Sequence, residues 1–355
     1  MEITVKQVPE AQRKPHIPDD QLVFGRQFTD HMFVMEYDAG KGWHSARIEP
    51  YGPFSLEPSA LVLHYAQEIF EGMKAFRRED GRIAIFRPKD NFARFNHSAE
   101  RLCMPQMDEA FMLDALKQLV RLDQSWVPQT LGTSLYIRPT MIATEAVLGV
   151  RPSSSYLCYI ILSPVGAYYK AGLKPVNIWI TDKYVRAAPG GTGDTKAGAN
   201  YAISLYGGEE AHKYGCEQVL WLDAVHRRYV EEVGSMNMMF VYDGKVVTSP
   251  LHGTILNGVT RRSILTLVKD MGIEVEERAL SVDEIMEGAA SGRLSEAFGT
   301  GTACVVSPVG KLTFNETAIP IGKGGMGELT AKLYDTLTGI QYGRQEDKYG
   351  WIEFI

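Results

Sequence analysis

The sequence predicts a mixed α+β fold in two domains, and three observations lead to this prediction. The chain has 355 residues, more than one compact core usually holds. Strand-like and helix-like patterns occur in both halves, but strict strand–helix alternation is missing, so a doubly wound dinucleotide-binding sheet is not expected. Turn residues separate two β-rich stretches near the middle. We therefore expect a domain over 1–163, a linker over 164–175 and a second domain over 176–355.

The first domain reads as strands with two helices. Apolar or alternating runs predict strands over 60–65, 134–138 and 156–162, and a hairpin over 76–86 that turns at 79–81. Asp90 is expected to cap a helix whose apolar face recurs at helical spacing in Phe92, Phe95, Ala99 and Leu102. A second helix is expected over about 108–126.

The second domain repeats this mixture. Strands are expected over 176–181 and 218–222, with a hairpin of 238–242 and 246–249 that turns at Asp243 and Gly244. One helix is expected over about 199–212 and another around Ile264 and Leu267. The last helix is expected from apolar residues at helical spacing, namely Met326, Leu329, Leu333, Leu337 and Ile340.

Composition excludes several function classes. Hydrophobic residues make up 45% and charged residues 23%, with a net charge of −6, and no basic cluster interleaves with aromatic residues, so no nucleic-acid partner is expected. No apolar run approaches the ~20 residues of a membrane span, and the first residues lack a signal core, which predicts a cytoplasmic protein. The four cysteines and eight histidines are scattered, so no metal site is expected.

Lys196 is the first candidate for chemistry. It follows a loop that contains Gly190, Gly191 and Gly193, which permit a close approach of the backbone to a ligand. A lysine amine in such a setting can form a Schiff base with an aldehyde cofactor. The alternative is a solvated lysine after a flexible loop. The loop lacks both the Gly-Lys-Ser/Thr ending and the six-residue glycine fingerprint, so a phosphate must be held elsewhere.

Glu232 is the second candidate, because it lies between β-type residues and the small residues Gly234 and Ser235. A carboxylate that faces inward here would need a cationic partner, and a protonated pyridine nitrogen would serve. Pyridoxal phosphate requires such a carboxylate and a Schiff-base lysine together. The alternative is an exposed acidic pair, Glu231 and Glu232, on a hairpin.

Two segments could hold a phosphate. The stretch 256–262 leads into a helix, whose positive N-terminus would present the amides of Val259 and Thr260. The stretch 299–303 is rich in small and hydroxyl-bearing residues, and Arg94 could supply a permanent cation. Each feature has a plainer interpretation, as a helix cap, a tight turn or a solvated arginine.

Taken in order, these segments resemble the branched-chain amino acid aminotransferases, which are class IV aminotransferases of pyridoxal-phosphate fold type IV. The matching stretches cover nearly the whole chain beyond the first twenty residues: 70–76, 91–98, 135–139, 148–150, 164–168, 191–201, 218–222, 232–237, 258–262 and 301–304. The resemblance implies a fold like that of D-amino acid aminotransferase. Its N-terminal α/β domain is the smaller one, and its larger C-terminal domain has a pseudo-barrel β core.

The resemblance also implies roles for cofactor-binding residues. Lys196 matches the lysine that forms the Schiff base and moves the proton at the substrate's α-carbon. Glu232 matches the carboxylate on the pyridine nitrogen, and Tyr201 the hydroxyl that donates to the cofactor's phenolic oxygen. The residues that match the phosphate-binding set are Arg94, Val259, Thr260 and Thr302.

Substrate-binding residues follow in the same way. Thr302 and Ala303 match the groups that receive the α-carboxylate. The side-chain pocket matches Phe70, Tyr136 and Tyr168, completed in a homodimer by Tyr65 of the partner subunit and Val150 of the partner subunit. Arg138, through a tyrosine, would pair with the distal carboxylate of glutamate or 2-oxoglutarate, and Tyr136 and Arg138 share one strand face at period two.

The activity implied is reversible transfer of the amino group between L-leucine, L-isoleucine or L-valine and 2-oxoglutarate, the last step of branched-chain synthesis and the first of degradation. D-amino acid aminotransferases and aminodeoxychorismate lyases are alternatives within the fold, and a non-catalytic binding protein is an alternative outside catalysis. Relatives with a Cys-x-x-Cys redox pair differ here, because Ser307 replaces the second cysteine.

Overall fold

The computed structural model describes residues 1–167 and 174–355. It divides into two compact units. The first contains Met1–Lys170, Lys196–Gly198 and Ile340–Ile355, and the second contains Ala171–Thr195 and Ala199–Gly339. The boundaries expected from the sequence stay a prediction, and residues 168–173 of the expected linker lie outside the described residues.

The first unit is built on one largely antiparallel sheet. Its order is β1-β3-β2-β8-β7-β5-β6-β18, with β4 paired to β7. The strands are β1 (Thr4–Val5), β2 (His31–Asp38), β3 (Gly42–Pro50), β4 (Glu68–Phe70), β5 (Met73–Arg77), β6 (Ile83–Phe86), β7 (Ser134–Ala143), β8 (Ser155–Val165) and β18 (Ile352–Phe354). The expected hairpin is confirmed, because β5 and β6 pair antiparallel on either side of Gly81.

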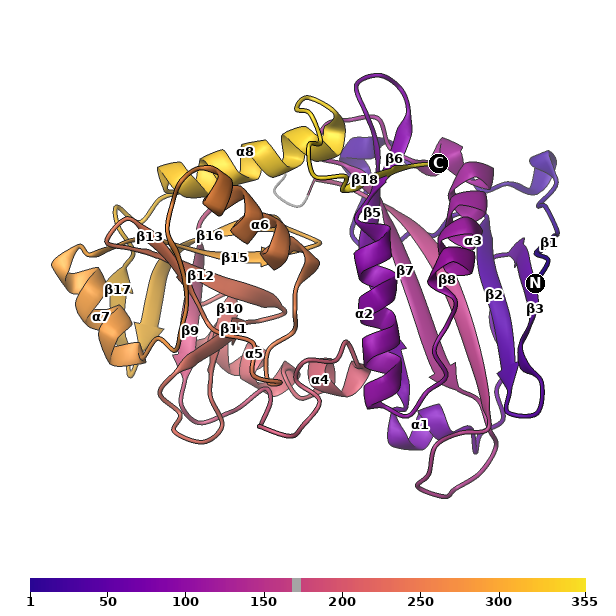
Figure 1. The fold of residues 1–355 in the computed structure, drawn as a ribbon, viewed down its shortest axis with the longest axis horizontal. Coiled ribbons are helices and arrows are strands. Elements are labelled where there is room, and N and C mark those ends of the chain that lie inside the picture. Colours follow the sequence, from indigo (N-terminus) through magenta and orange to yellow (C-terminus); the bar gives the residue numbers. More distant parts are fainter. Residues whose placement is uncertain (168–173) are drawn as a thin grey trace. The chain divides into compact units, whose positions relative to one another are not determined.

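Two helices cover one face of this sheet, α2 (Pro88–Arg101) and α3 (Glu109–Leu122) (Figure 1). Phe92, Phe95 and Leu116 are fully buried in one core with Phe33 and Leu135 of the sheet. The Asp108 carboxylate caps α3 by accepting from the amides of Ala110 and Phe111. A 3-10 turn over Gln124–Trp126 follows α3, so the expected helix ends earlier than predicted.

Two local predictions for this unit are wrong. Residues 61–65 form the short helix α1 (Leu61–Tyr65) instead of a strand, because only Leu61 of this apolar run is buried and short runs carry no decisive period. Asp90 does not cap α2. The helix begins at Pro88, which has no amide hydrogen to satisfy, and Asp90 pairs with the Arg87 guanidinium at 2.7 Å.

The second unit contains a closed barrel. Its sheet order is β11-β10-β9-β16-β15-β12-β13-β14, and β11 also pairs with β12, so six strands (β9, β10, β11, β12, β15 and β16) form a ring. The strands are β9 (Val176–Thr181), β10 (Gln218–Leu222), β11 (Val230–Val233), β12 (Met236–Tyr242), β13 (Lys245–Thr248), β14 (Val275–Glu277), β15 (Leu294–Gly301), β16 (Val305–Phe314) and β17 (Thr317–Pro320). The pseudo-barrel core expected for this part of the chain is confirmed.

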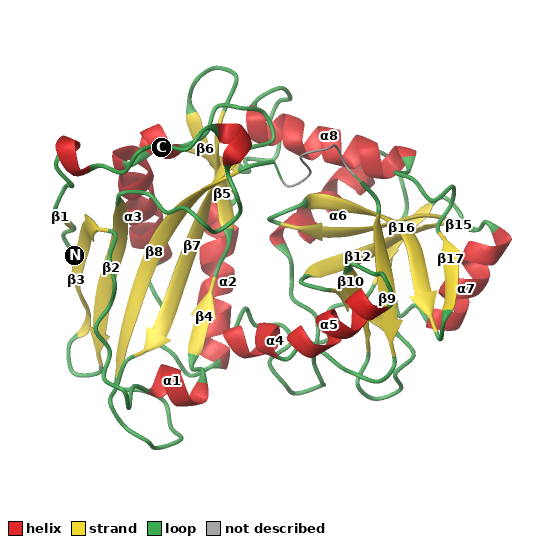
Figure 2. Ribbon diagram, turned by 180° about the vertical axis from the view of Figure 1, so that it is seen from behind, coloured by secondary structure: helices red, strands yellow, loops and turns green. Residues whose placement is uncertain are grey.

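Helices pack around the barrel strands, with α5 near β9 and β10 (Figure 2). They are α4 (Gly198–Ala202), α5 (Leu205–Lys213), α6 (Val259–Asp270), α7 (Val282–Ser291) and α8 (Glu328–Tyr342). The single helix expected over 199–212 is interrupted, because the amide and hydroxyl of Ser204 both bond to the Tyr201 carbonyl. Met326 precedes α8 and is exposed, so its assignment to that helix is wrong.

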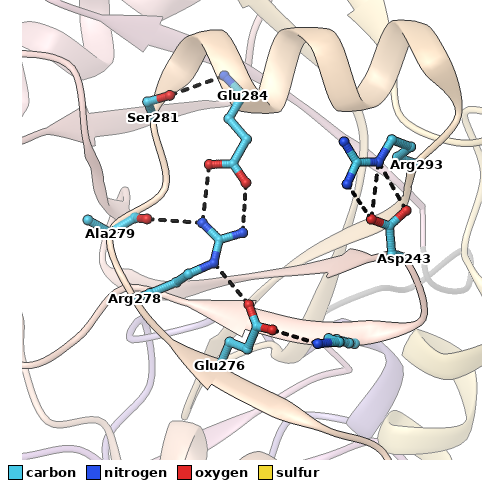
Figure 3. A network of polar contacts seen from close by, with 8 residues as sticks. Asp243, Glu276, Arg278, Ala279, Ser281, Glu284 and Arg293 are labelled. Carbon is cyan, nitrogen blue, oxygen red and sulfur yellow. Dashed lines mark hydrogen bonds and ion pairs between the residues drawn. The ribbon is translucent and has the colours of Figure 1, made fainter.

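An ion-pair network fastens α7 to the sheet (Figure 3). The Arg278 guanidinium contacts Glu276 of β14 and makes a two-pronged contact with Glu284 of α7. Ser281 caps the same helix by accepting from the Glu284 amide. These groups are partly exposed, so we assign them a structural role. No helix in the described ranges combines the length and apolar character that a membrane span requires.

Candidate active site

In the first unit, Lys196 lies against the aromatic ring of Phe70. The Lys196 Nζ atom is 4.9 Å from the ring centroid. The backbone is fixed on two sides, since the Lys196 amide donates to Ser98 Oγ of α2 at 3.0 Å and its carbonyl accepts from the Phe70 amide at 2.9 Å. The lysine therefore stands at a defined place beside β4.

Tyr136 and Arg138 of β7 lie next to the same ring. Arg138 Nη2 donates to the Tyr136 hydroxyl at 3.1 Å, and its guanidinium carbon lies 4.6 Å from the Phe70 ring centroid. The expectation that both side chains share one strand face is confirmed. Arg138 Nε is buried and has no hydrogen-bond partner within the described residues, which leaves this nitrogen as a donor for an anionic group.

Arg94 is not a solvated arginine. Its Nε and Nη2 donate to the two carboxylate oxygens of Glu71, at 2.7 and 2.9 Å, and both side chains are buried. Sequence reasoning missed Glu71. Its signal was a charged residue between the apolar pair Ile69-Phe70 and Gly72-Met73.

Glu68 is a further ionisable group of this region. Burial raises the pKa of the Glu68 carboxyl, and the nearby positive charge of Arg138 opposes that shift. A Cβ atom on Gly198 would lie against the Glu68 carboxylate, so glycine is required there.

In the second unit, Glu232 stands in a row of polar residues across three barrel strands. The register pairs Glu232 with Asn237 and Asn237 with Thr300. Glu232 Oε1 accepts from Asn237 Nδ2 at 2.9 Å and from the Leu256 amide at 3.1 Å. Glu231 and Glu232 are only 8% and 3% exposed, so the alternative of an exposed acidic pair is wrong.

Glu232 has a cationic partner in this chain. Its Oε2 atom lies 2.8 Å from Arg186 Nη1, and both side chains are buried. Sequence reasoning anticipated the need for a cation but missed Arg186, which lies in the loop after β9 and carries no local pattern beyond its charge.

The N-terminus of α6 is adjacent to this row. The helix begins at Val259, with Gly258 as N-cap, so Val259 and Thr260 occupy the first two positions, as predicted. The amides at these positions have no acceptor within the helix. A Cβ atom on Gly258 would lie 2.1 Å from Asn237 Oδ1, so glycine here allows α6 to approach the strand that carries Asn237.

The other expected residues are placed as follows. Thr302 and Ala303 form the turn between β15 and β16, just beyond Thr300, and Tyr201 lies half-buried in α4. Tyr65 and Val150 are exposed on the first unit, and Tyr168 lies outside the described residues. Each unit therefore gathers its own part of the expected site.

These residues fit the chemistry of pyridoxal phosphate. The cofactor has an aldehyde, a dianionic phosphate and a basic ring nitrogen. The first unit offers a lysine amine at a fixed place, and the second offers a buried carboxylate beside a helix N-terminus that suits a phosphate. The described residues contain no cluster of three or more His, Cys, Asp or Glu side chains that could hold a metal ion.

Comparisons with known proteins agree with this chemistry. The model of the amino-transferase class IV family matches residues 68–312. The chain is 52% identical over 339 residues to branched-chain-amino-acid aminotransferase 2 of Bacillus subtilis (strain 168), covering 96% of this chain and 93% of that protein. It is 50% identical to the branched-chain-amino-acid aminotransferase of Mycolicibacterium smegmatis, over 93% of this chain and 91% of that protein.

Solved structures show the same fold. A crystal structure of Escherichia coli branched-chain amino acid aminotransferase superposes with a TM-score of 0.75 at 27% identity, over 90% of this chain and 98% of that one. The branched-chain amino acid aminotransferase of T.th., solved with pyridoxamine 5′-phosphate, gives a TM-score of 0.74 at 26% identity, over 91% and 98% of the two chains. This chain belongs to the class IV aminotransferase family and, within it, to the branched-chain-amino-acid aminotransferases.

Proposed function

We propose that the enzyme transfers the amino group reversibly between L-leucine, L-isoleucine or L-valine and 2-oxoglutarate, with pyridoxal 5′-phosphate as its cofactor. One observation carries the substrate part of this proposal. The Phe70 ring has the Lys196 amine 4.9 Å and the Arg138 guanidinium 4.6 Å from its centroid. An apolar surface beside the amine suits an aliphatic side chain, and the guanidinium suits the distal carboxylate of glutamate.

The cofactor would be held by residues of both units. Arg94, the amides of Val259 and Thr260, and Thr302 would hold the phosphate, while Glu232 would hold the proton at the ring nitrogen and Tyr201 would donate to the phenolic oxygen. When bound, pyridoxal phosphate supplies the carbon that takes up the amino group and a ring that spreads negative charge.

The chain's own groups perform the proton transfers and the selection. Lys196 would bind the cofactor covalently and, as a free amine, would move the proton at the substrate's α-carbon. The turn amides at Thr302 and Ala303 would orient the α-carboxylate. Phe70, Tyr136 and Tyr168 would exclude water from the aliphatic group, and they would separate leucine, isoleucine and valine poorly, because one methylene is worth only ~1–3 kcal/mol.

Exposed apolar residues support a homodimer in which Tyr65 of the partner subunit and Val150 of the partner subunit complete each site. Leu63 and Tyr65 of α1 and Leu148 and Val150 are all exposed. Their segments are joined, since the Val147 amide donates to the Ser59 carbonyl at 3.1 Å. Such a patch is typical of an interface. Light scattering is expected to give twice the chain mass, and Val150→Asp is expected to weaken the dimer. We place the enzyme in the cytoplasm.

A substrate experiment tests the proposal. The purified protein should absorb in the visible range, and L-leucine should bleach this absorption and release the branched 2-oxo acid. With 2-oxoglutarate as acceptor, the three branched-chain amino acids should turn over continuously. D-leucine is the matched control for a D-amino acid aminotransferase. Bleaching by D-leucine alone, or colour without 2-oxo acid, would contradict the proposal.

A further inference from the structure

Arg186 connects three segments of the second unit through one nitrogen atom. Its Nη1 lies 2.8 Å from Glu232 Oε2 and donates to the carbonyls of Gly193 and Thr254, at 3.2 and 3.3 Å. Gly193 belongs to the loop that precedes Lys196. This loop passes so close that a Cβ atom on Gly193 would lie 2.4 Å from the Thr254 carbonyl oxygen. The guanidinium thus ties Glu232 to the glycine-rich loop.

The contacts leave the Glu232 carboxylate little freedom. One oxygen is held by Asn237 and the Leu256 amide, and the other by Arg186. A guanidinium is always charged and favours an ionised carboxylate beside it. Without this partner, a buried carboxylate would need to turn toward another donor or take up a proton.

We infer that Arg186 is a positioning residue, which fixes the orientation and the negative charge of Glu232 for its work on the cofactor's ring nitrogen. This inference rests on the proposed function. An ionised carboxylate that already shares its charge with a guanidinium leaves the shared proton on the ring nitrogen. The arrangement exists before the cofactor binds, so no reorganisation is required during the reaction.

A double-mutant cycle tests this role, because it measures whether one side chain acts through another. The variants are Arg186→Gln, Glu232→Gln and their combination. The measurements are the single-turnover rate with L-leucine and the affinity of the apoprotein for pyridoxal phosphate. We expect Arg186→Gln to lower the rate by about tenfold or more in the native background and by less than about twofold beside Glu232→Gln.

Two further variants separate positioning from a loss of stability. Arg186→Lys keeps the charge and should retain more of the rate than Arg186→Gln, although it loses the planar fork. The matched control is Arg261→Gln, because Arg261 is also buried and pairs with Glu277 at 2.7 Å instead of with Glu232. Its effects should add to those of Glu232→Gln in both measurements.

The outcomes are distinguishable. If Arg186→Gln lowers the rate and the affinity equally in both backgrounds, Arg186 does not act through Glu232 and the inference is overturned, while the proposed function stands. If the native protein neither binds pyridoxal phosphate nor consumes leucine, the proposed function and the inference fail together. Coupling seen with Arg186 but not with Arg261 supports the inference.

Discussion

The carboxylate of Glu71 holds the guanidinium of Arg94 through two parallel hydrogen bonds, at 2.7 and 2.9 Å, with both groups buried. A two-pronged contact of this kind fixes the plane of the guanidinium and compensates its charge. Arg94 would therefore meet a phosphate in a set orientation. Its neighbour Asn91, one turn earlier on α2, also lies near Nη2, at 3.5 Å.

Glu71→Gln should make the apoprotein less stable and the cofactor more stabilising. Removing one partner of a buried ion pair costs about 3–5 kcal/mol, because the other charge stays buried without compensation. A phosphate would then supply the missing negative charge. Thermal unfolding should show a lower midpoint without pyridoxal phosphate and a larger rise on adding it than in the native protein.

The control for this substitution is Glu145→Gln, which breaks the more exposed pair of Glu145 with Arg151. Exposed pairs contribute little, so a small change is expected. Equal stabilisation of the native and Glu71→Gln proteins by the cofactor would separate Arg94 from the phosphate.

Arg138→Met should discriminate between the two substrate classes. Loss of a charge-assisted hydrogen bond costs about 1.5–3 kcal/mol, so KM for 2-oxoglutarate and glutamate should rise about 10- to 100-fold. The half-reaction with leucine should change little, because an aliphatic chain makes no use of the guanidinium. Tyr136→Phe, which removes only the hydroxyl that accepts from Arg138, should shift the same ratio less. Equal losses with leucine and glutamate would refute the assignment.

Gly258→Ala should weaken cofactor binding while the protein still folds. The added Cβ would lie 2.1 Å from Asn237 Oδ1, and Asn237 also bonds to Glu232, so both the N-terminus of α6 and the carboxylate should shift. The affinity of the apoprotein for pyridoxal phosphate should fall by about tenfold, which is about 1.4 kcal/mol. Gly208→Ala in α5 is the control, since a Cβ there meets open space. It should leave the affinity unchanged, and unaltered binding by Gly258→Ala would exclude this region from the site.

Glu231→Gln should stabilise the protein at neutral and higher pH. Burial raises the pKa of the Glu231 carboxyl, whose Oε1 accepts from Thr254 Oγ1. The ionised form is therefore disfavoured in the folded state, and stability falls as pH rises from the ordinary value of 4.5 through the raised one. Glutamine keeps the acceptor and removes the charge.

The thermal midpoint of Glu231→Gln should exceed that of the native protein by a few degrees at pH 8, and the difference should vanish below about pH 4. The exposed Glu209 provides the control substitution Glu209→Gln. A lower midpoint at pH 8 would mean that the Glu231 charge is stabilising.

Local patterns predicted much of the barrel and part of the site. The strands over 176–181 and 218–222 match β9 and β10 because each is a short buried run bounded by turn residues. The α6 N-terminus was visible because Gly258 precedes a clear helical period. The short helix α1 was not predictable, since five mostly apolar residues carry no decisive period. The pairs Glu71–Arg94 and Arg186–Glu232 were missed because only the tertiary fold brings their members together.

The identity of the covalent lysine is the most direct test of this account. The protein loaded with pyridoxal phosphate should be reduced with borohydride, digested and mapped by mass spectrometry. Lys74, a buried lysine of β5, serves as an internal control. The account predicts the reduced cofactor on Lys196 alone, and no adduct in Lys196→Ala. An adduct on Lys74 or any other lysine would contradict it.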